Sequence, residues 1–217
     1  MPNLALPRSA PTNTSAPIPR PGVAAVLALW LALVLVLGAG DAFVTPPGQA
    51  PLPILLGVLI PIAAFFAACG LSRRFRDFAL ATDLRLISAI QAWRFAGFGF
   101  VALYAHGVLP GLFAWPAGLG DMAVGLTAPW IALALLRRPD FAAGRTFLAW
   151  NLFGILDLVV AVSMGALATM LASGAEGEIT GGPMATLPLL LIPVYLVPLF
   201  VMLHGVALLQ TRHRRAA

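Results

Sequence analysis

Residues 115–136 read "WPAGLGDMAVGLTAPWIALALL" and are followed directly by Arg137 and Arg138. The run has the length of roughly 20 residues that an α-helix needs to cross the hydrocarbon core of a bilayer. Because backbone groups in lipid must find their partners within the same segment, the run predicts a helix and not a strand. This stretch therefore predicts a membrane span, and Asp121 inside it needs a physical explanation.

The whole chain has the composition of a membrane protein. Of its 217 residues, 60% are hydrophobic and 10% are charged, whereas a soluble domain carries about 25% charged residues. Five further apolar runs of similar length are Val23–Ala39, Leu52–Leu71, Leu86–His106, Thr146–Leu167 and Leu187–Leu209. We therefore expect an all-α membrane protein in which residues 23–210 form a bundle of six transmembrane helices joined by short loops.

The two ends of the chain differ from this apolar middle. Residues 1–22 are rich in Pro, Ser and Thr, which predicts a disordered cytoplasmic tail, and residues 211–217 predict a short basic cytoplasmic tail. A different interpretation makes the first apolar run a cleaved signal peptide, because arginines precede it and small residues follow it. The long Pro-rich lead is atypical of such a peptide, and both interpretations remain open.

The positions of the arginines predict the orientation of the bundle. All 13 basic residues are Arg, and apart from Arg94 they lie before the first span, in two alternate loops, or after the last span. The positive-inside rule then predicts that both termini lie in the cytoplasm. Because topology explains the basic charge, we expect no nucleic-acid partner. The preference for Arg, Ala, Gly and Pro suggests a bacterial protein, which places the bundle in the inner membrane.

A few polar residues fall at membrane depth and predict a buried site. An unpaired Arg or Asp at a helix centre costs about 2.5–3.5 kcal/mol on insertion scales. These groups should therefore face the interior of the bundle and meet one another. Counting about 1.5 Å of rise per residue places Arg94 and Asp157 within reach of each other, with Asp121 accessible from above. Gln91 and Asn151 should form a polar layer beneath the pair.

The charges of this predicted site allow two functions. One arginine cannot neutralise two carboxylates, so the less well paired Asp is favoured in its protonated form and could take up and release a proton. The first hypothesis is accordingly a small proton-coupled transporter or permeation protein, in which Arg94 binds an anionic group or holds Asp157. The alternative is a structural or accessory membrane protein whose charges serve helix packing only. The solute, the direction of transport, the oligomeric state and any partner beyond the lipid bilayer stay open.

Three other polar residues are accessory candidates. Tyr104 and His106 lie near the outer end of the third span, while His204 lies near the inner end of the sixth, where a cation would suit the helix dipole. The two histidines are at opposite membrane faces, which excludes a haem held between them. The chain has no Walker motif, Gly-rich nucleotide loop, HExxH or CxxC, so we expect no cofactor and no metal site.

The letters "GLGD" at Gly118–Asp121 resemble the GxGD motif of intramembrane aspartyl proteases such as presenilin-like enzymes and prepilin peptidases. That resemblance implies a catalytic Asp121 working with a second aspartate on an earlier helix. Here Asp157 lies on the following helix, and the Pro-Ala-Leu and Lys signatures of those families are absent. A protease is therefore a minor alternative, and enzymatic activity is not the main expectation.

A wider pattern, "QAWRFAGFGF…LPGLFAWPAGLGDMAVGLTAPW…WNLFGILDLVVAV…IPVYLVPL", covers about residues 85–210. It resembles a group of hypothetical bacterial multi-pass membrane proteins. The resemblance implies a membrane bundle and no particular activity.

Overall fold

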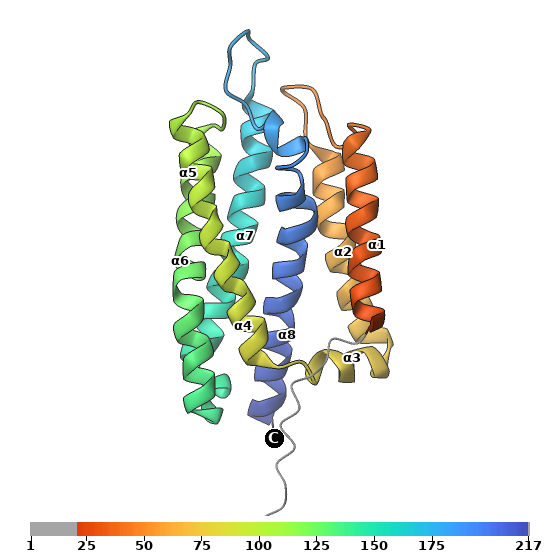
Figure 1. Ribbon diagram of the computed structural model, residues 1–217, viewed down its shortest axis with the longest axis vertical. Helices are drawn as coiled ribbons and strands as arrows, with labels where there is room; N and C mark the ends of the chain where they lie inside the picture. The colour runs from red at the N-terminus through yellow and green to blue at the C-terminus, as the bar shows by residue number, and fades with distance from the viewer. Residues whose placement is uncertain (1–20, 217) are drawn as a thin grey trace, which may run out of the picture.

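Six helical stretches are long and apolar enough to cross a membrane in the computed structural model, which describes residues 21–216. They form a bundle (Figure 1), so the described part of the chain is that of an all-helical membrane protein. The N-terminal tail predicted for residues 1–22 lies outside the described residues except for its last two. The helices are α1 (Pro21–Ala39), α2 (Leu52–Leu71), α3 (Arg73–Leu80), α4 (Leu84–Ile90), α5 (Phe98–Ala105), α6 (Gly111–Arg137), α7 (Arg145–Leu171) and α8 (Val197–Ala216).

The third span is a single continuous helical rod whose middle is not α-helical. Between α4 and α5, residues Gln91–Gly97 form a 3₁₀ segment, η1. Side chains three residues apart eclipse one another in a 3₁₀ helix. Gln91, Arg94 and Gly97 therefore lie in one line, and all three are buried. This alignment places Arg94 in the interior of the bundle.

The sixth span is shifted along the chain from its predicted bounds. A π-helical segment, η4 (Ile192–Leu196), leads into α8, and α8 continues to Ala216 instead of ending at Leu209. The polar residues at its end are held by the bundle. Gln210 donates a hydrogen bond of 2.8 Å to the carbonyl oxygen of Thr82, and Arg215 donates one of 2.8 Å to the carbonyl oxygen of Ala143. The residues predicted as a basic tail are thus helical through 216.

The short helix α3 was not predicted. It begins at the N-cap Ser72, whose hydroxyl accepts a hydrogen bond of 3.3 Å from the Phe75 amide. Its arginines alternate with phenylalanines at helical spacing, which is typical of a helix lying in the membrane interface. Figure 1 shows α3 lying across one end of the bundle. We call this end, which also holds Arg137, Arg138 and the end of α8, the arginine-rich end.

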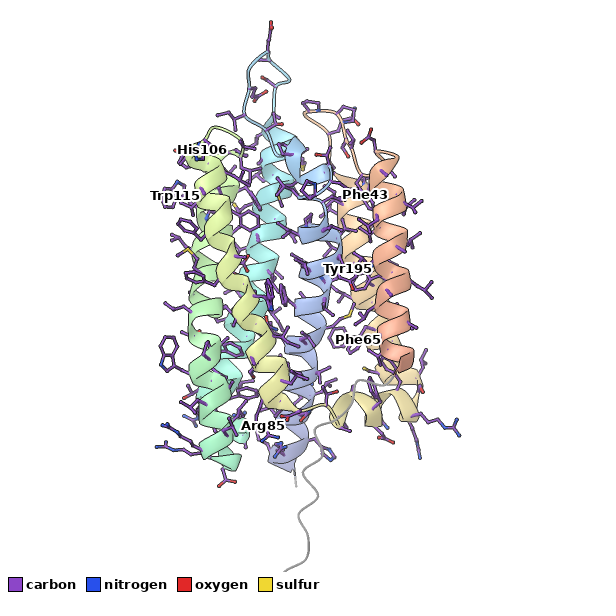
Figure 2. All side chains as sticks on the ribbon, viewed as in Figure 1. Phe43, Phe65, Arg85, His106, Trp115 and Tyr195 are labelled. Atoms are coloured by element: carbon purple, nitrogen blue, oxygen red, sulfur yellow. The ribbon has the colours of Figure 1, made fainter. Side chains whose placement is uncertain are left out.

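The opposite end holds loops 40–51, 106–110 and 172–191, which contain no arginine, and we call it the arginine-free end. Figure 2 shows His106 and Trp115 near this end and Arg85 at the other.

In the interior, α6 packs against η1 and α7, while α8 packs against α7 and α2. One apolar cluster includes Phe100, Phe113 and Ala117, and another includes Ile87, Phe147 and Val206. The polar site lies on the helices between these clusters.

Candidate functional site: a buried arginine between two aspartates

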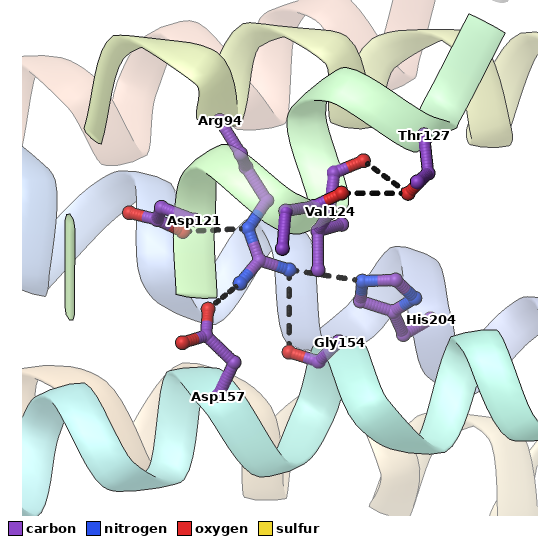
Figure 3. Close-up of polar contacts among 8 residues, drawn as sticks. Arg94, Asp121, Val124, Thr127, Gly154, Asp157 and His204 are labelled. Atoms are coloured by element: carbon purple, nitrogen blue, oxygen red, sulfur yellow. Dashed lines mark hydrogen bonds and ion pairs between the residues drawn. The ribbon is translucent and has the colours of Figure 1, made fainter. Parts of the chain in front are cut away.

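Arg94 is the centre of the site, and its guanidinium makes contacts with three other helices (Figure 3). Its Nε donates a hydrogen bond of 2.7 Å to Oδ1 of Asp121 on α6, and its Nη2 pairs with Oδ2 of Asp157 on α7. The predicted contact of Arg94 with Asp157 is therefore present, and Asp121 shares the same guanidinium. The Arg94 side chain is completely buried, so the ion pairs lie in a low-dielectric interior.

His204 is part of the same site, and its predicted place at the inner end of the sixth span is wrong. Because α8 ends at Ala216 and not at Leu209, His204 lies about 18 Å before the end of the helix. Its Nε2 lies 3.1 Å from Nη1 of Arg94. A guanidinium only donates, so Nε2 accepts. The remaining ring proton is then on Nδ1, which lies 2.9 Å from Oδ1 of Asn151.

Asn151 completes this chain of hydrogen bonds and does not form the predicted layer with Gln91. Its Nδ2 donates a hydrogen bond of 2.8 Å to the carbonyl oxygen of Phe147. Both ends of the Asn151 amide are therefore used within α7 and by His204. The Gln91 amide oxygen and nitrogen, and the Ser88 hydroxyl, are buried without a hydrogen-bond partner among the described residues. The prediction of a Gln91–Asn151 pair is thus wrong, although both side chains are buried.

Glycines allow the charged side chains to approach the neighbouring backbones. A Cβ atom at Gly97 would collide with Asp121, one at Gly120 with the carboxylate of Asp157, and one at Gly154 with the ring of His204. The Gly154 carbonyl oxygen also accepts a hydrogen bond of 3.2 Å from Nη1 of Arg94. Gly97, Gly120 and Gly154 therefore let the charged side chains lie directly against the neighbouring helices.

Two neighbouring glycines differ in how closely other helices approach them. A Cβ at Gly118 would lie 2.7 Å from the side chain of Val101 and 3.1 Å from the carbonyl oxygen of Gly97, so this glycine allows close helix approach. Gly99 has open space beside it and does not serve this purpose.

A cavity of about 60 Å³ leads to Asp121. It is lined by α2, α5, α6, α7, η4 and the start of α8, and it extends from Pro51 and Gly181 at the arginine-free end to the Asp121 side chain. Asp121 is accordingly 15% exposed, compared with 5% for the Asp157 side chain. Oδ1 of Asp121 binds Arg94, and Oδ2 makes no hydrogen bond within the part of the chain that the structure describes. One carboxylate of the site is thus accessible and the other is enclosed.

The accessory candidates of the third span lie outside the site. The ring of Tyr104 packs on Trp115 with a centroid distance of 5.8 Å, and His106 is the C-cap residue of α5 at the arginine-free end. Neither residue contacts Arg94 or its partners. The rise per residue along the predicted spans identified Arg94, Asp121 and Asp157 as neighbours, but nothing in the sequence indicated that the Gly154 carbonyl would join them.

The geometry of the two aspartates differs from that of a protease dyad, in which two carboxylates share a proton and activate a water molecule between them. Here the Arg94 guanidinium lies between Asp121 and Asp157 and is bonded to both (Figure 3). The resemblance of Gly118–Asp121 to the protease motif is therefore limited to the sequence of these four residues and does not extend to the geometry of the two aspartates.

Residues 51–212 match the model of a family described as Domain of unknown function (DUF8737). This match extends from the start of α2 to near the end of α8 and includes every residue of the Arg94 site. No curated protein and no solved structure matches the chain.

Proposed function

This chain belongs to the DUF8737 family, and we propose that it is a small proton-coupled transporter in which Asp121 and Asp157 carry the proton. The observation that supports this proposal is one buried guanidinium shared by two carboxylates, one of which borders a cavity from the arginine-free end. A carboxylate with access to a cavity can exchange a proton or a ligand. An enclosed one cannot do so without movement.

The charge of the site supports proton uptake. With both carboxylates ionised, Arg94, Asp121 and Asp157 together carry one net negative charge, and one bound proton makes the site neutral. His204 adds no charge in the neutral form that its hydrogen bonds assign. Because net charge inside a membrane protein is costly, on the order of 3 kcal/mol for a central Asp, the site gains from holding one proton or one cation.

Protonation also changes the packing of the helices. A protonated Asp121 loses its ion pair with Arg94 and keeps only a weaker hydrogen bond, whereas the bonds of Arg94 to Gly154, Asp157 and His204 remain unchanged. These retained contacts join η1 to α7 and α8, and the weakened one joins η1 to α6. Proton binding therefore favours a shift of α6 relative to the other three elements, which is the movement that a coupled transporter needs.

The arginine distribution supports an orientation for this transporter. The arginine-rich end lies in the cytoplasm by the positive-inside rule, with both termini, including the predicted N-terminal tail, on that side. The protein is then a bacterial inner-membrane protein, and the cavity opens to the outside. Ser88 and Gln91, buried and without partners among the described residues, precede Arg94 along the third span. They offer hydrogen-bonding groups between the site and the cytoplasm.

A second candidate function is structural, and the packed glycines favour it. Gly97, Gly120 and Gly154 fit the charged side chains so closely that the same network would also fix the helices in register. In that case Asp121 and Asp157 would only form hydrogen bonds that hold the helices together, and neither would take up or release a proton.

The experiment that separates the two functions is proton-linked flux in proteoliposomes containing a pH-sensitive dye. Solutes of cationic, anionic and neutral classes are added outside, and the luminal pH is followed. We expect a solute-driven pH change with the wild type and with Asp140→Asn, an exposed control. We expect none with Asp121→Asn or Asp157→Asn. Folded Asn variants with wild-type flux would contradict the transport proposal, and the packing function would stand.

A further inference from the structure

We infer that the substrate is a small organic cation with an apolar body, which binds in the cavity with its charged group on Oδ2 of Asp121. This inference rests on the proposed function and names the class of molecule that the proton is exchanged for. It depends on three features of the cavity: its lining, the accessibility of its charges and its size.

The lining of the cavity is apolar except at its end. Asp121 is its only ionisable residue among those that the structure describes. The hydroxyl of Thr169, the other polar group, donates a hydrogen bond of 3.0 Å to the Gly165 carbonyl oxygen. Ligand sites that are mostly apolar with one well-placed polar group select molecules of matching pattern. A ligand here needs an apolar body and one polar end.

The accessible charge is negative. The Arg94 side chain is completely buried, and its donors bind Asp121, Asp157, Gly154 and His204. An anion that entered the cavity would meet a carboxylate before it could reach the guanidinium. The earlier expectation that Arg94 binds an anionic group is therefore replaced, because the structure makes Arg94 the holder of the carboxylates. Phe100 and Phe113 also line the cavity, and aromatic faces attract cations.

The size of the cavity limits the substrate to a few heavy atoms. A water molecule needs about 10–15 Å³, so a cavity of about 60 Å³ holds about as much as four to six water molecules. A short alkylammonium ion such as butylammonium has this size and the required pattern of charge and apolar surface.

Binding of such a cation balances the release of one proton. An ammonium N–H donates to Oδ2 of Asp121 as the carboxyl proton leaves to water, and the site is neutral before and after. The other groups of the site keep their charge states: Arg94 on η1 stays cationic, Asp157 on α7 stays ionised, and His204 on α8, which contacts Arg94, stays neutral. Cation and proton therefore compete for one carboxylate, which is the requirement for exchange across a membrane.

The test uses the full chain in lipid nanodiscs, with empty nanodiscs as the blank. Butylammonium, butyrate and butanol each have a four-carbon chain, and they are cationic, anionic and neutral, respectively. Calorimetry measures binding, and a pH electrode in weak buffer measures proton release. We expect only butylammonium to bind, with about one proton released per protein. Its apparent Kd should rise about tenfold for each unit by which the pH falls, over the range in which Asp121 is protonated, because one proton competes with one cation.

Two variants locate the binding. Asp121→Asn should abolish both binding and proton release, whereas Asp140→Asn should keep them. Ala166→Phe, which fills the cavity without touching the charged network, should abolish binding and leave the melting temperature of the protein unchanged within a few degrees. Ala166 lines the cavity and is only partly buried, so the larger ring enters the open space of the cavity at little cost to folding.

Three results would overturn the inference. Butyrate or butanol binding with no butylammonium binding would show a different substrate class. Equal butylammonium binding to wild type and Asp121→Asn would place the cation elsewhere. No binding of any of the three would exclude a small alkyl cation as ligand. If solute-driven flux still depends on Asp121 and Asp157 in these cases, the transporter stands and only the substrate class fails. If that flux is also absent, the proposed function fails as well.

Discussion

Arg94 stabilises the bundle by forming ion pairs with two carboxylates that have no other cation partner among the described residues. Removing one partner of a buried ion pair costs about 3–5 kcal/mol, because the other charge is left uncompensated. Arg94→Ala should therefore lower the melting temperature in detergent more than Arg94→Ala combined with Asp157→Ala. Arg85→Ala, which removes an exposed pair with Asp83, is the control and should have a small effect. If the double variant melts no higher than the single one, Arg94 and Asp157 are not energetically coupled.

Gly120 is the glycine on which the position of Asp157 depends. A methyl group there would overlap the Asp157 carboxylate, and overpacking of a filled interior costs about 1–3 kcal/mol. We expect Gly120→Ala to be destabilised by this amount in chemical unfolding. Gly99→Ala, in the open space of the third span, should be neutral or stabilised by about 0.5 kcal/mol through the better helix propensity of Ala. Equal effects of the two substitutions would mean that Gly120 does not set the position of the ion pair.

Among the elements, the six spans could be predicted closely, because the length of an apolar run is dictated by the bilayer. Leu52–Leu71 has the predicted bounds, and α5 ends one residue before the predicted His106. The end of α8 could not be predicted in this way. Gln210 and Thr211 look like the start of a polar tail, but Gln210 donates a tertiary hydrogen bond to the Thr82 carbonyl oxygen, and the Thr211 hydroxyl donates to the Ala207 carbonyl oxygen within α8. Because the end of this span was predicted too early in the chain, His204 was expected near the end of the helix and not beside Arg94.

The Gln91–Asn151 pair failed for a related reason. Similar height along two helices was the basis of the prediction, but height does not define which face of a helix a side chain occupies. The 3₁₀ segment changes the angular position of Gln91 relative to Arg94, and Asn151 turns to His204. Charge pairing could be predicted because an unpaired charge is so costly in lipid. Amide pairing could not, since several partners of similar energy compete.

The start of the third span depends on Asp83. Its carboxylate accepts a hydrogen bond of 2.8 Å from the Arg85 amide and binds the Arg85 side chain. The side-chain hydrogen bond from Arg85 is the main cause that lowers the pKa of Asp83. Asp83→Ala should destabilise α4 by about 1 kcal/mol, as loss of an N-cap does, measured by hydrogen exchange of the α4 amides.

This effect should depend on pH with a defined sign. Because the folded state lowers the pKa of Asp83, its contribution is fully present above the unfolded value of about 3.9. It is lost as the pH falls through the lower folded pKa. The difference in α4 exchange between wild type and Asp83→Ala should therefore disappear at acid pH. A difference that grows on acidification would contradict this role of Asp83.

At the scale of the whole molecule, the arginine distribution predicts which end faces the cytoplasm. In a Cys69→Ser background, cysteines placed at Arg138 and Arg214 should resist a membrane-impermeant thiol reagent added to intact cells, and a cysteine at Glu176 should react. All three positions are exposed at the ends of the bundle, so differences in labelling report the side of the membrane. Strong labelling at Arg138 or Arg214 in intact cells would reverse the orientation.

The central claim is that the Arg94 site holds one exchangeable proton on its carboxylates, and infrared difference spectroscopy across a pH titration tests it most directly. The C=O stretch of a protonated carboxylic acid is separate from the bands of a carboxylate. We predict that the wild type gains the intensity of one carboxylic acid at the site as the pH falls. This signal should be absent from the Asp121→Asn, Asp157→Asn double variant and retained in Asp140→Asn. A double variant that shows the full wild-type signal would mean that the site carries no exchangeable proton and serves helix packing alone.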